Sequence, residues 1–338
     1  MADRVLVTGG TGFLGKRCVA ELLARGYDVR TTVRDLGREA ELRTDLAAAG
    51  TDPGDRLELA AADLNADDGW AEAAADCRYV LHVASPFPPE QPKDPDELIV
   101  PAREGAKRAL TAALDVGAER VVLTSSVAAI QADRTSSEAG PLNEDDWTDG
   151  NDPSRRPYTR SKALAERAAW DLVTERGARE RLATVNPGAI IGPVIGAERS
   201  YSLQAIQRLL DGDMPAIPQL GFSWVDVRDV ADLHIRAMTD PTAAGRRYVA
   251  ADRYLWFADV AAILRERLGE DAAKVPKRVA PNLLIRVAGL FDKSIRSITD
   301  DLGKRTYVSS ERARSELGWQ PRPIEDSIVD CARSLLAG

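Results

Sequence analysis

The chain has 338 residues, of which 44% are hydrophobic and 29% charged, and its formal net charge is −8. This composition is typical of a globular protein with one large or two unequal domains. The acidic balance and the absence of a Lys/Arg block argue against general affinity for nucleic acid. No run of about 18 apolar residues occurs, so we expect no membrane span.

The cysteines Cys18, Cys77 and Cys331 are far apart, and there is no CxxC pair or His/Cys cluster. This arrangement favours neither a zinc site nor a disulfide framework, so we expect no metal. Three scattered thiols fit a reducing compartment. The N-terminus runs directly into a short apolar strand, unlike a signal peptide. We therefore expect a cytoplasmic protein.

Over the first 190 residues, short β-rich runs alternate with amphipathic helices. Arg4–Thr8 is predicted to be a buried strand, and Phe13–Arg25 carries its apolar residues on one helical face, with Gly26 ending the helix. Further strands are expected at Asp28–Arg34, Leu57–Ala61, Tyr79–Val83, Arg120–Ser125 and Ala183–Val185. The alternation predicts an α/β fold with a Rossmann-type, doubly wound parallel sheet.

After about Pro187 this rhythm weakens. Phe222–Val225 and Arg247–Val249 are expected as late strands that return to the sheet. Helices are expected at Ala258–Leu268, Asn282–Phe291, Ser309–Leu317 and Ile324–Leu336. We therefore assign residues 1–187 plus about 222–253 to a dinucleotide-binding domain. Residues of about 188–221 plus 254–338 form a smaller, mainly helical substrate domain.

Two long polar loops, Pro86–Pro95 and Asp133–Pro157, are candidate substrate loops, because long loops beside a site often carry binding residues. The alternative is ordinary mobile surface.

The strongest local signal is the segment Thr8–Gly15, which reads TGGTGFLG. It follows the first strand and opens the first helix, the context that a dinucleotide-binding turn requires. Gly9 permits the tight turn, Gly12 lets the backbone approach a pyrophosphate, and Gly15 lets the helix pack closely. The alternative is a βα turn without a ligand. The cofactor contacts expected in this turn are Gly9, Thr11, Gly12, Phe13, Leu14 and Gly15.

Tyr158 and Lys162 are four residues apart on an expected helix, so they share a face. A tyrosine with a pKa of about 10 is a poor proton shuttle near neutrality, but a nearby ammonium group favours its phenolate. The pair can then act as a general acid and base. Ser126 closes the preceding strand and can donate a hydrogen bond to a carbonyl oxygen that gains negative charge.

The GxxGxxG spacing, the Ser125-Ser126 pair and the YxxxK motif occur in the order typical of the extended short-chain dehydrogenase/reductases, and the chain resembles this family. The resemblance continues through Val185–Gly188, Trp224–Val230 and Glu316–Arg322, so it covers nearly the whole chain. Within the superfamily of NAD-dependent epimerases and dehydratases, the chain is most similar to the dihydroflavonol and cinnamoyl-CoA reductases, a group with many microbial aldehyde and ketone reductases. The segments that carry this similarity are Thr32–Asp35, Leu81–Pro86, Asp146–Asp149 and Tyr158–Trp170.

The resemblance implies that the cofactor is NADP(H). Arg34 ends the second strand, where an arginine accommodates the 2′-phosphate, and Arg38 is placed to assist, although Asp35 lies between them. For Asp63, a role as a helix N-cap is a strong alternative. The further cofactor contacts that the resemblance implies are Asp63, Leu64, Ala84, Ser85, Tyr158, Lys162, Pro187 and Gly188.

The expected substrate contacts are Ser126, Gln131, Tyr158 and Trp224, although aromatic residues such as Trp224 are usually core. Gln131 stands where plant flavonoid reductases carry a substrate-binding asparagine. The segment Arg156–Lys162 also differs from the NWYCYGK signature of the cinnamoyl-CoA reductases. The sequence therefore predicts a small-molecule carbonyl substrate without identifying it.

The predicted reaction is reversible hydride transfer from NADPH to an aldehyde or ketone. In it, Ser126 orients the carbonyl group, Tyr158 protonates its oxygen and Lys162 holds the cofactor. Two alternatives are a nucleotide-sugar epimerase or dehydratase with bound NAD, and a non-catalytic NADP-sensing regulator. His82 and His234 have no companions at ligand spacing, so we expect structural roles for both. The protein is expected to be a monomer or a homodimer.

Overall fold

The computed structural model describes residues 2–86, 94–131, 136, 137, 139–197, 200–291, 296 and 298–337. Residues 87–93 of the first predicted substrate loop, and residues 133–135 and 138 of the second, lie outside the described residues. Within the described part of the chain, no helix is both long enough and apolar enough to cross a membrane.

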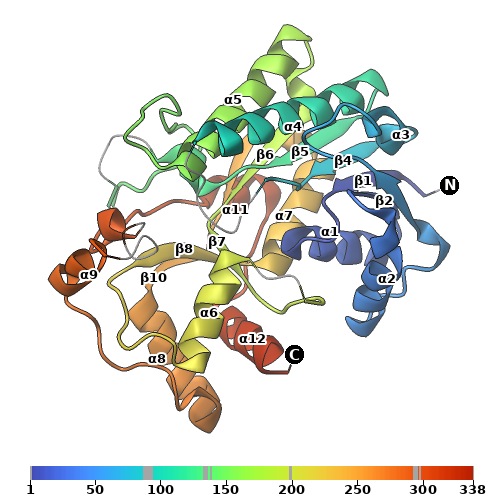
Figure 1. Cartoon of the computed structure of the whole chain (residues 1–338). Coiled ribbons are helices and arrows are strands. Elements are labelled where there is room, and N and C mark those ends of the chain that lie inside the picture. The colour runs from blue at the N-terminus through green and yellow to red at the C-terminus, as the bar shows by residue number, and fades with distance from the viewer. Residues whose placement is uncertain are drawn as a thin grey trace.

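A seven-stranded parallel sheet forms the centre of the molecule (Figure 1), in the order β3-β2-β1-β4-β5-β6-β9. The order reverses between β1 and β4, which is where ligands bind in doubly wound sheets. Its strands are β1 (Arg4–Thr8), β2 (Asp28–Val33), β3 (Leu57–Ala61), β4 (Tyr79–His82), β5 (Arg120–Thr124), β6 (Leu182–Pro187) and β9 (Arg247–Ala250). This sheet confirms the predicted fold class.

Helices cover both faces of the large sheet (Figure 1). One face carries α3 (Trp70–Ala74), α4 (Asp96–Asp115) and α5 (Pro157–Glu175). The other carries α1 (Phe13–Ala24), α2 (Glu39–Ala48) and α7 (Val227–Thr239). Successive strand residues point to opposite faces. Val5 and Val7 therefore pack with α1 and α7, whereas Leu6 packs with α3 and α4.

A second sheet of three strands corrects one expectation. Phe222–Val225 does form a strand, β8 (Gly221–Asp226), but it pairs with β7 (Ala189–Ile191) and β10 (Arg253–Trp256) instead of joining the large sheet. The physical reason lies in the pairing partners, because β7 and β10 are short segments that the sequence pattern did not reveal. The division into two domains stays a prediction.

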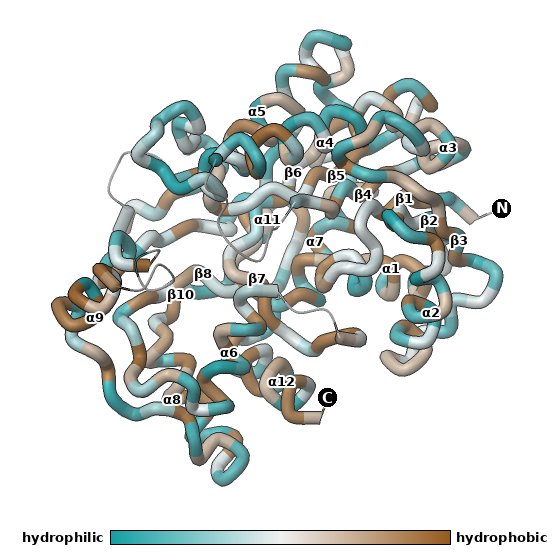
Figure 2. Tube along the Cα trace, viewed as in Figure 1, coloured by the Kyte–Doolittle hydropathy of each residue, from teal (hydrophilic) through white to brown (hydrophobic). Residues whose placement is uncertain are grey.

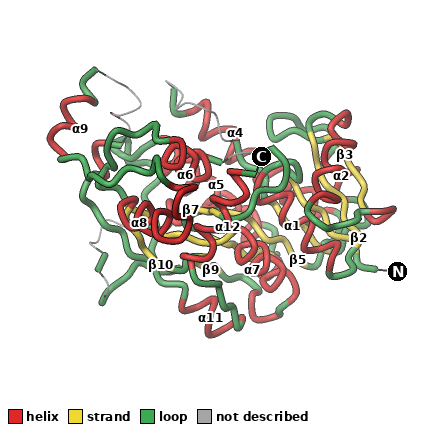
Figure 3. Tube along the Cα trace, turned by 90° about the horizontal axis from the view of Figure 1, so that it is seen from below, coloured by secondary structure: helices red, strands yellow, loops and turns green. Residues whose placement is uncertain are grey.

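The smaller sheet packs against α6 (Tyr201–Asp211), α8 (Phe257–Leu268) and α12 (Ile324–Leu336), which share one hydrophobic cluster with Trp224. Seen from below, this part lies at the end of the molecule opposite to β2 and β3 (Figure 3). The helix α9 (Asn282–Ala288) projects at its margin as a strongly apolar segment (Figure 2), with Leu283 72% exposed. The short α11 (Glu311–Leu317) contacts α7 and β9.

Candidate active site

The glycine turn lies between β1 and α1, and a different physical constraint favours glycine at each of its positions. Gly9 has a φ of +71°, a conformation that favours glycine. A Cβ on Gly15 would lie 2.1 Å from the Gly9 carbonyl oxygen, and one on Gly10 would lie 2.0 Å from the Thr31 hydroxyl. The helix and β2 therefore pack against the turn too closely for any side chain.

Gly12 differs from its neighbours, because a Cβ there would meet only the Gly9 carbonyl oxygen, at 3.5 Å. Gly12 is the N-cap of α1 and has no side chain to satisfy the first-turn N–H groups. The space in front of it is left open by the rest of the described chain. This open, uncapped helix terminus fits a pyrophosphate, whose charge would be stabilised by the N–H groups.

Ser126 and Tyr158 meet at the carboxyl end of β5. The Ser126 hydroxyl accepts a hydrogen bond from Ala128 N at 3.1 Å, which caps a 3₁₀ helix at Val127–Ile130. Burial raises the pKa of Tyr158, and a hydrogen bond with Ser126 opposes this effect. We expected Lys162 to stabilise the phenolate form of Tyr158 and so to lower its pKa. In the protein without bound cofactor, the pKa of Tyr158 is raised instead. Desolvation dominates and favours the neutral phenol, the form that can protonate an oxygen.

Lys162 lies one turn beyond Tyr158, with its Nζ atom 6.0 Å from the centre of the Tyr158 ring. Its ammonium group donates a hydrogen bond to Ser85 Oγ at 2.9 Å, so the predicted contact residue Ser85 lies beside the pair. Burial lowers the pKa of Lys162 to about 8, and Glu166 opposes this shift. Lys162 is therefore mainly protonated at neutral pH and titrates just above it.

His82 is buried next to the site and has a structural role. The Thr8 hydroxyl accepts N–H groups from Val83 and Ala84 at 3.0 and 2.9 Å, so its own proton goes to Nδ1 of His82. Burial, assisted by Lys162, lowers the pKa of His82 to about 3. The neutral ring thus ties the end of β1 to the end of β4.

The residues predicted to select the cofactor follow β2, which ends at Val33, one residue earlier than expected. Arg34 is exposed and has no hydrogen-bond or ion-pair partner among the described residues. The Asp35 carboxylate accepts a hydrogen bond from Gly37 N at 2.8 Å, whereas Arg38 pairs with Glu41 at 2.9 Å. Arg34 is therefore the available guanidinium at this corner.

The other predicted cofactor residues lie along the same edge of the sheet. The Asp63 carboxylate accepts a hydrogen bond from Asn65 N at 2.8 Å and so caps a turn rather than a helix. Leu64 packs closely against Gly105 of α4. The remaining predicted contacts lie in the glycine turn and the start of α1, or at the carboxyl ends of β4 and β6: Thr11, Phe13, Leu14, Ala84, Pro187 and Gly188.

The predicted substrate residues are not all brought together. Gln131 ends the 3₁₀ helix that Ser126 begins and is half-buried. Trp224 is fully buried, its indole N–H donates to the Leu255 carbonyl oxygen, and its ring packs against Phe257. A substrate role for Trp224 stays a prediction, while its packing gives it a structural role.

Sequence reasoning missed a buried network behind the site. Glu166, Asn186 and Arg247 are all buried, and the Glu166 carboxylate accepts hydrogen bonds from both of the others. A signal was present, because Glu166 is the one acidic residue on the alanine-rich face that follows Lys162, and Asn186 interrupts an apolar strand. Their partnership depends on residues up to 81 positions apart and was not visible in any local pattern.

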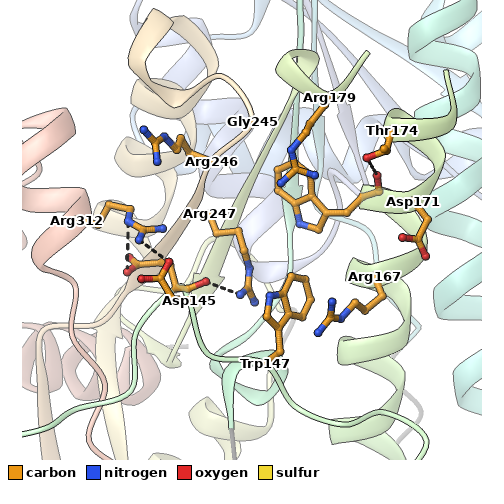
Figure 4. Close-up of a pocket in the computed structure, with 12 residues that line it drawn as sticks. Asp145, Trp147, Arg167, Asp171, Thr174, Arg179, Gly245, Arg246, Arg247 and Arg312 are labelled. Atoms are coloured by element: carbon orange, nitrogen blue, oxygen red, sulfur yellow. Dashed lines mark hydrogen bonds and ion pairs between the residues drawn. The ribbon is translucent and has the colours of Figure 1, made fainter. Parts of the chain in front are cut away.

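A separate cavity of about 420 Å³ lies beside this network (Figure 4). The Trp147 ring lies between the guanidinium groups of Arg167 and Arg247, at 3.7 and 3.6 Å from its centre. None of the proposed catalytic side chains lines this cavity.

The parallel sheet, the open glycine turn and the Ser126–Tyr158–Lys162 group together define a dinucleotide-binding protein of the Rossmann type. The model of the NAD dependent epimerase/dehydratase family matches residues 5–251. The chain belongs to this family, which confirms the resemblance seen in the sequence.

Individual relatives extend the comparison over the whole chain. Cinnamoyl-CoA reductase CAD2 of Medicago truncatula is 33% identical over 340 residues, which cover 99% of this chain and 96% of that protein. The structure of Gre2 from Candida albicans in complex with NADPH has a TM-score of 0.79 and 26% identity, with 99% of each chain covered. Yeast methylglyoxal/isovaleraldehyde reductase Gre2, complexed with NADPH, has the same fold, with a TM-score of 0.80, 24% identity and coverage of 99% and 98%.

Proposed function

We propose that this protein is an NADPH-dependent reductase of a small aldehyde or ketone. The observation that carries the proposal is the arrangement of Ser126, Tyr158 and Lys162 at the carboxyl end of β5, beside the open glycine turn. The similarity to the Medicago cinnamoyl-CoA reductase and to Gre2 bound to NADPH supports it.

The side chains divide the work of a carbonyl reduction. Bound NADPH would supply the hydride. Ser126 donates a hydrogen bond to the carbonyl oxygen, where negative charge develops. Tyr158, kept neutral by burial, gives its proton to that oxygen. The Lys162 ammonium stabilises the resulting phenolate and is placed to hold the cofactor ribose.

The choice of cofactor rests on Arg34. A guanidinium offers planar, charge-assisted hydrogen bonds to a phosphate. Because Arg34 is exposed and without a partner among the described residues, it is free to contact the 2′-phosphate that distinguishes NADPH from NADH. This same feature weighs against the alternative of an epimerase with bound NAD. The intact tyrosine–lysine pair weighs against a non-catalytic regulator.

The test follows the loss of NADPH absorbance at about 340 nm with a panel of aldehydes and ketones that includes isovaleraldehyde. We expect turnover with at least one carbonyl compound. Tyr158→Phe should retain NADPH binding while kcat falls about 100-fold or more, because general acid catalysis contributes on that order. Turnover near that of the wild type in Tyr158→Phe would exclude Tyr158 as the proton donor. No oxidation of NADPH with any member of the panel would contradict the proposed activity.

A further inference from the structure

Glu166 lies one helical turn beyond Lys162 on α5, and its side chain is fully buried. Burial raises the pKa of Glu166, but Arg247 and several hydrogen bonds outweigh that effect, so the pKa is lowered overall. A buried carboxylate is costly unless it is paired and hydrogen-bonded in this way. The groups that donate to it are Arg247 Nε at 2.7 Å, Ser125 Oγ at 2.5 Å, Asn186 Nδ2 at 2.8 Å, Thr184 Oγ1 at 3.1 Å and Trp170 Nε1 at 3.3 Å.

Two of these contacts lead to Ser126. Ser125 is its direct neighbour in the chain, and the Asn186 amide that donates to Glu166 also donates to the Ser126 carbonyl oxygen at 3.2 Å. The carboxylate thus anchors the end of β5 through a side chain on one side and a shared amide on the other. A shift of Glu166 would therefore move the backbone that carries the Ser126 hydroxyl.

A third effect of Glu166 is electrostatic. Lys162 and Glu166 line the same small cavity between β4, β5 and α5, although no hydrogen bond or ion pair joins them. The other groups that face Lys162 carry no charge at neutral pH, since His82 and Tyr158 are both neutral and Ser85 is a hydroxyl. Glu166 is then the negative charge that offsets the burial of the Lys162 ammonium.

The positive charge of Arg247 partly neutralises the negative charge of Glu166. Its guanidinium pairs with the carboxylate at 2.7 Å and also donates to the carbonyl oxygens of Glu144 and Asp146, at 2.6 and 2.9 Å. Its plane lies over Trp147 at the wall of the cavity in Figure 4. Arg247 is therefore also held by contacts outside α5, in β9 and in the loop around Trp147.

We propose that Glu166 is a positioning residue for this active site. It anchors the strand end that carries Ser126, and it supplies the negative charge that keeps Lys162 in its ammonium form. The ion pair with Arg247 reduces the effect of this charge on Lys162. The inference rests on the proposed function for its catalytic meaning. Its electrostatic part concerns Lys162 itself and is open to a test by cofactor binding alone.

The experiment measures the dissociation constant of NADPH by its fluorescence, and kcat/KM for isovaleraldehyde, between about pH 6 and pH 9.5. For the wild type we expect the dissociation constant to rise and kcat/KM to fall above a midpoint near pH 8, where Lys162 loses its proton. Lys162→Met should lack this step, which would assign it. Glu166→Gln removes the negative charge, so the midpoint should fall by about one pH unit.

Arg247→Met provides the matched comparison. Both Glu166→Gln and Arg247→Met break the same buried ion pair and should lower the stability of the fold in a similar way. They should nevertheless move the midpoint in opposite directions. In Arg247→Met the hydrogen bonds from Ser125, Asn186 and Thr184 should keep Glu166 ionised, and its unopposed negative charge then raises the midpoint. Loss of stability alone cannot produce shifts of opposite sign. Glu175→Gln, an exposed change at the end of the same helix, should leave the midpoint unchanged.

Midpoints that stay near pH 8 in both variants, or that shift in the same direction, would overturn the inference. The binding measurement separates it from the proposed function. Opposite shifts in NADPH binding without reduction of any carbonyl would support the role of Glu166 and defeat the reductase proposal. Reduction with unshifted midpoints would defeat only the role of Glu166.

Discussion

Three charged side chains just after β2 have different interactions although they lie within five residues of one another. Asp35 uses its carboxylate to cap a short turn at Gly37, and Arg38 is held by Glu41. Arg34 alone is exposed with no partner among the described residues. Arg38 would have to give up its ion pair with Glu41 in order to bind a phosphate, and this reduces the net gain in binding free energy. Within the described part of the chain, Arg34 has no such pair to break.

Arg34→Ala should remove most of a preference for NADPH over NADH. Hydrogen bonds to charged groups contribute about 1.5–3 kcal/mol, which corresponds to a preference of roughly 10- to 150-fold. We expect kcat/KM with NADPH to fall by that factor and kcat/KM with NADH to stay nearly constant. Arg38→Ala is the control and should have a smaller effect. Equal losses with both cofactors would instead indicate a structural role for Arg34.

The two histidines of the chain should make the free energy of unfolding depend on pH. Burial lowers the pKa of His82 to about 3 and that of His234 to about 4, and Nδ1 of His234 donates to the Val230 carbonyl oxygen. In the unfolded chain each has a pKa of about 6.5. Because the folded pKa is lower, the unfolded state binds more protons at acid pH. The stabilisation is therefore complete above about pH 6.5 and is lost as the pH falls towards 4 and 3.

Between pH 7 and pH 5, each histidine should lower the free energy of unfolding by about 2 kcal/mol. His234→Gln removes one titrating group, so its loss over this interval should be about 2 kcal/mol smaller than that of the wild type. Urea denaturation at the two pH values measures both losses. If the variant and the wild type lost the same amount, His234 would not be a buried neutral histidine.

At the scale of elements, different glycines of the β1–α1 turn are needed for packing and, we propose, for ligand binding. Gly15 is in contact with the turn itself, while Gly12 faces open space. The same type of residue is therefore required for the fold at one position and, we propose, for the cofactor at the other. The two substitutions can be compared directly because they lie three residues apart.

Gly12→Val should give a folded protein with severely weakened NADPH binding, because the new side chain would occupy the proposed pyrophosphate position. Gly15→Ala should instead lower stability, since its Cβ would lie 2.1 Å from the Gly9 carbonyl oxygen. Calorimetry with NADPH and thermal unfolding would distinguish the two effects. An unchanged dissociation constant in Gly12→Val would mean that the turn does not hold a phosphate.

At the scale of the whole molecule, the C-terminal segment connects the two hydrophobic cores. Trp319 is fully buried in the core beside α1 and α7, and its indole N–H donates to the Asp229 carbonyl oxygen at 2.9 Å. Five residues later, Ile324 begins α12 in the core of the smaller sheet. Arg322, between them, pairs with Asp229 at 2.9 Å. The end of the chain is thus part of both cores.

Trp319→Ala should lower the free energy of unfolding by about 3–5 kcal/mol, the usual range for removing a large buried aromatic side chain. Trp256→Ala is the matched control, because Trp256 is only half-buried and should cost less. Chemical denaturation followed by circular dichroism would measure both. A small loss in Trp319→Ala would show that the C-terminal segment contributes little to the large core.

The sequence by itself determined the features that depend on short stretches of chain. The parallel α/β alternation, the glycine turn, and the four-residue spacing of Tyr158 and Lys162 follow from local periodicity and backbone requirements, and the large-sheet strands were predicted with bounds within one or two residues. Only the tertiary structure decided that β8 joins a separate sheet, that Trp224 is core, and that Glu166 lies against Arg247. These outcomes depend on contacts between segments far apart in the chain. Burial, charge pairing and strand partnership are set by those contacts, and no local pattern of residues encodes them.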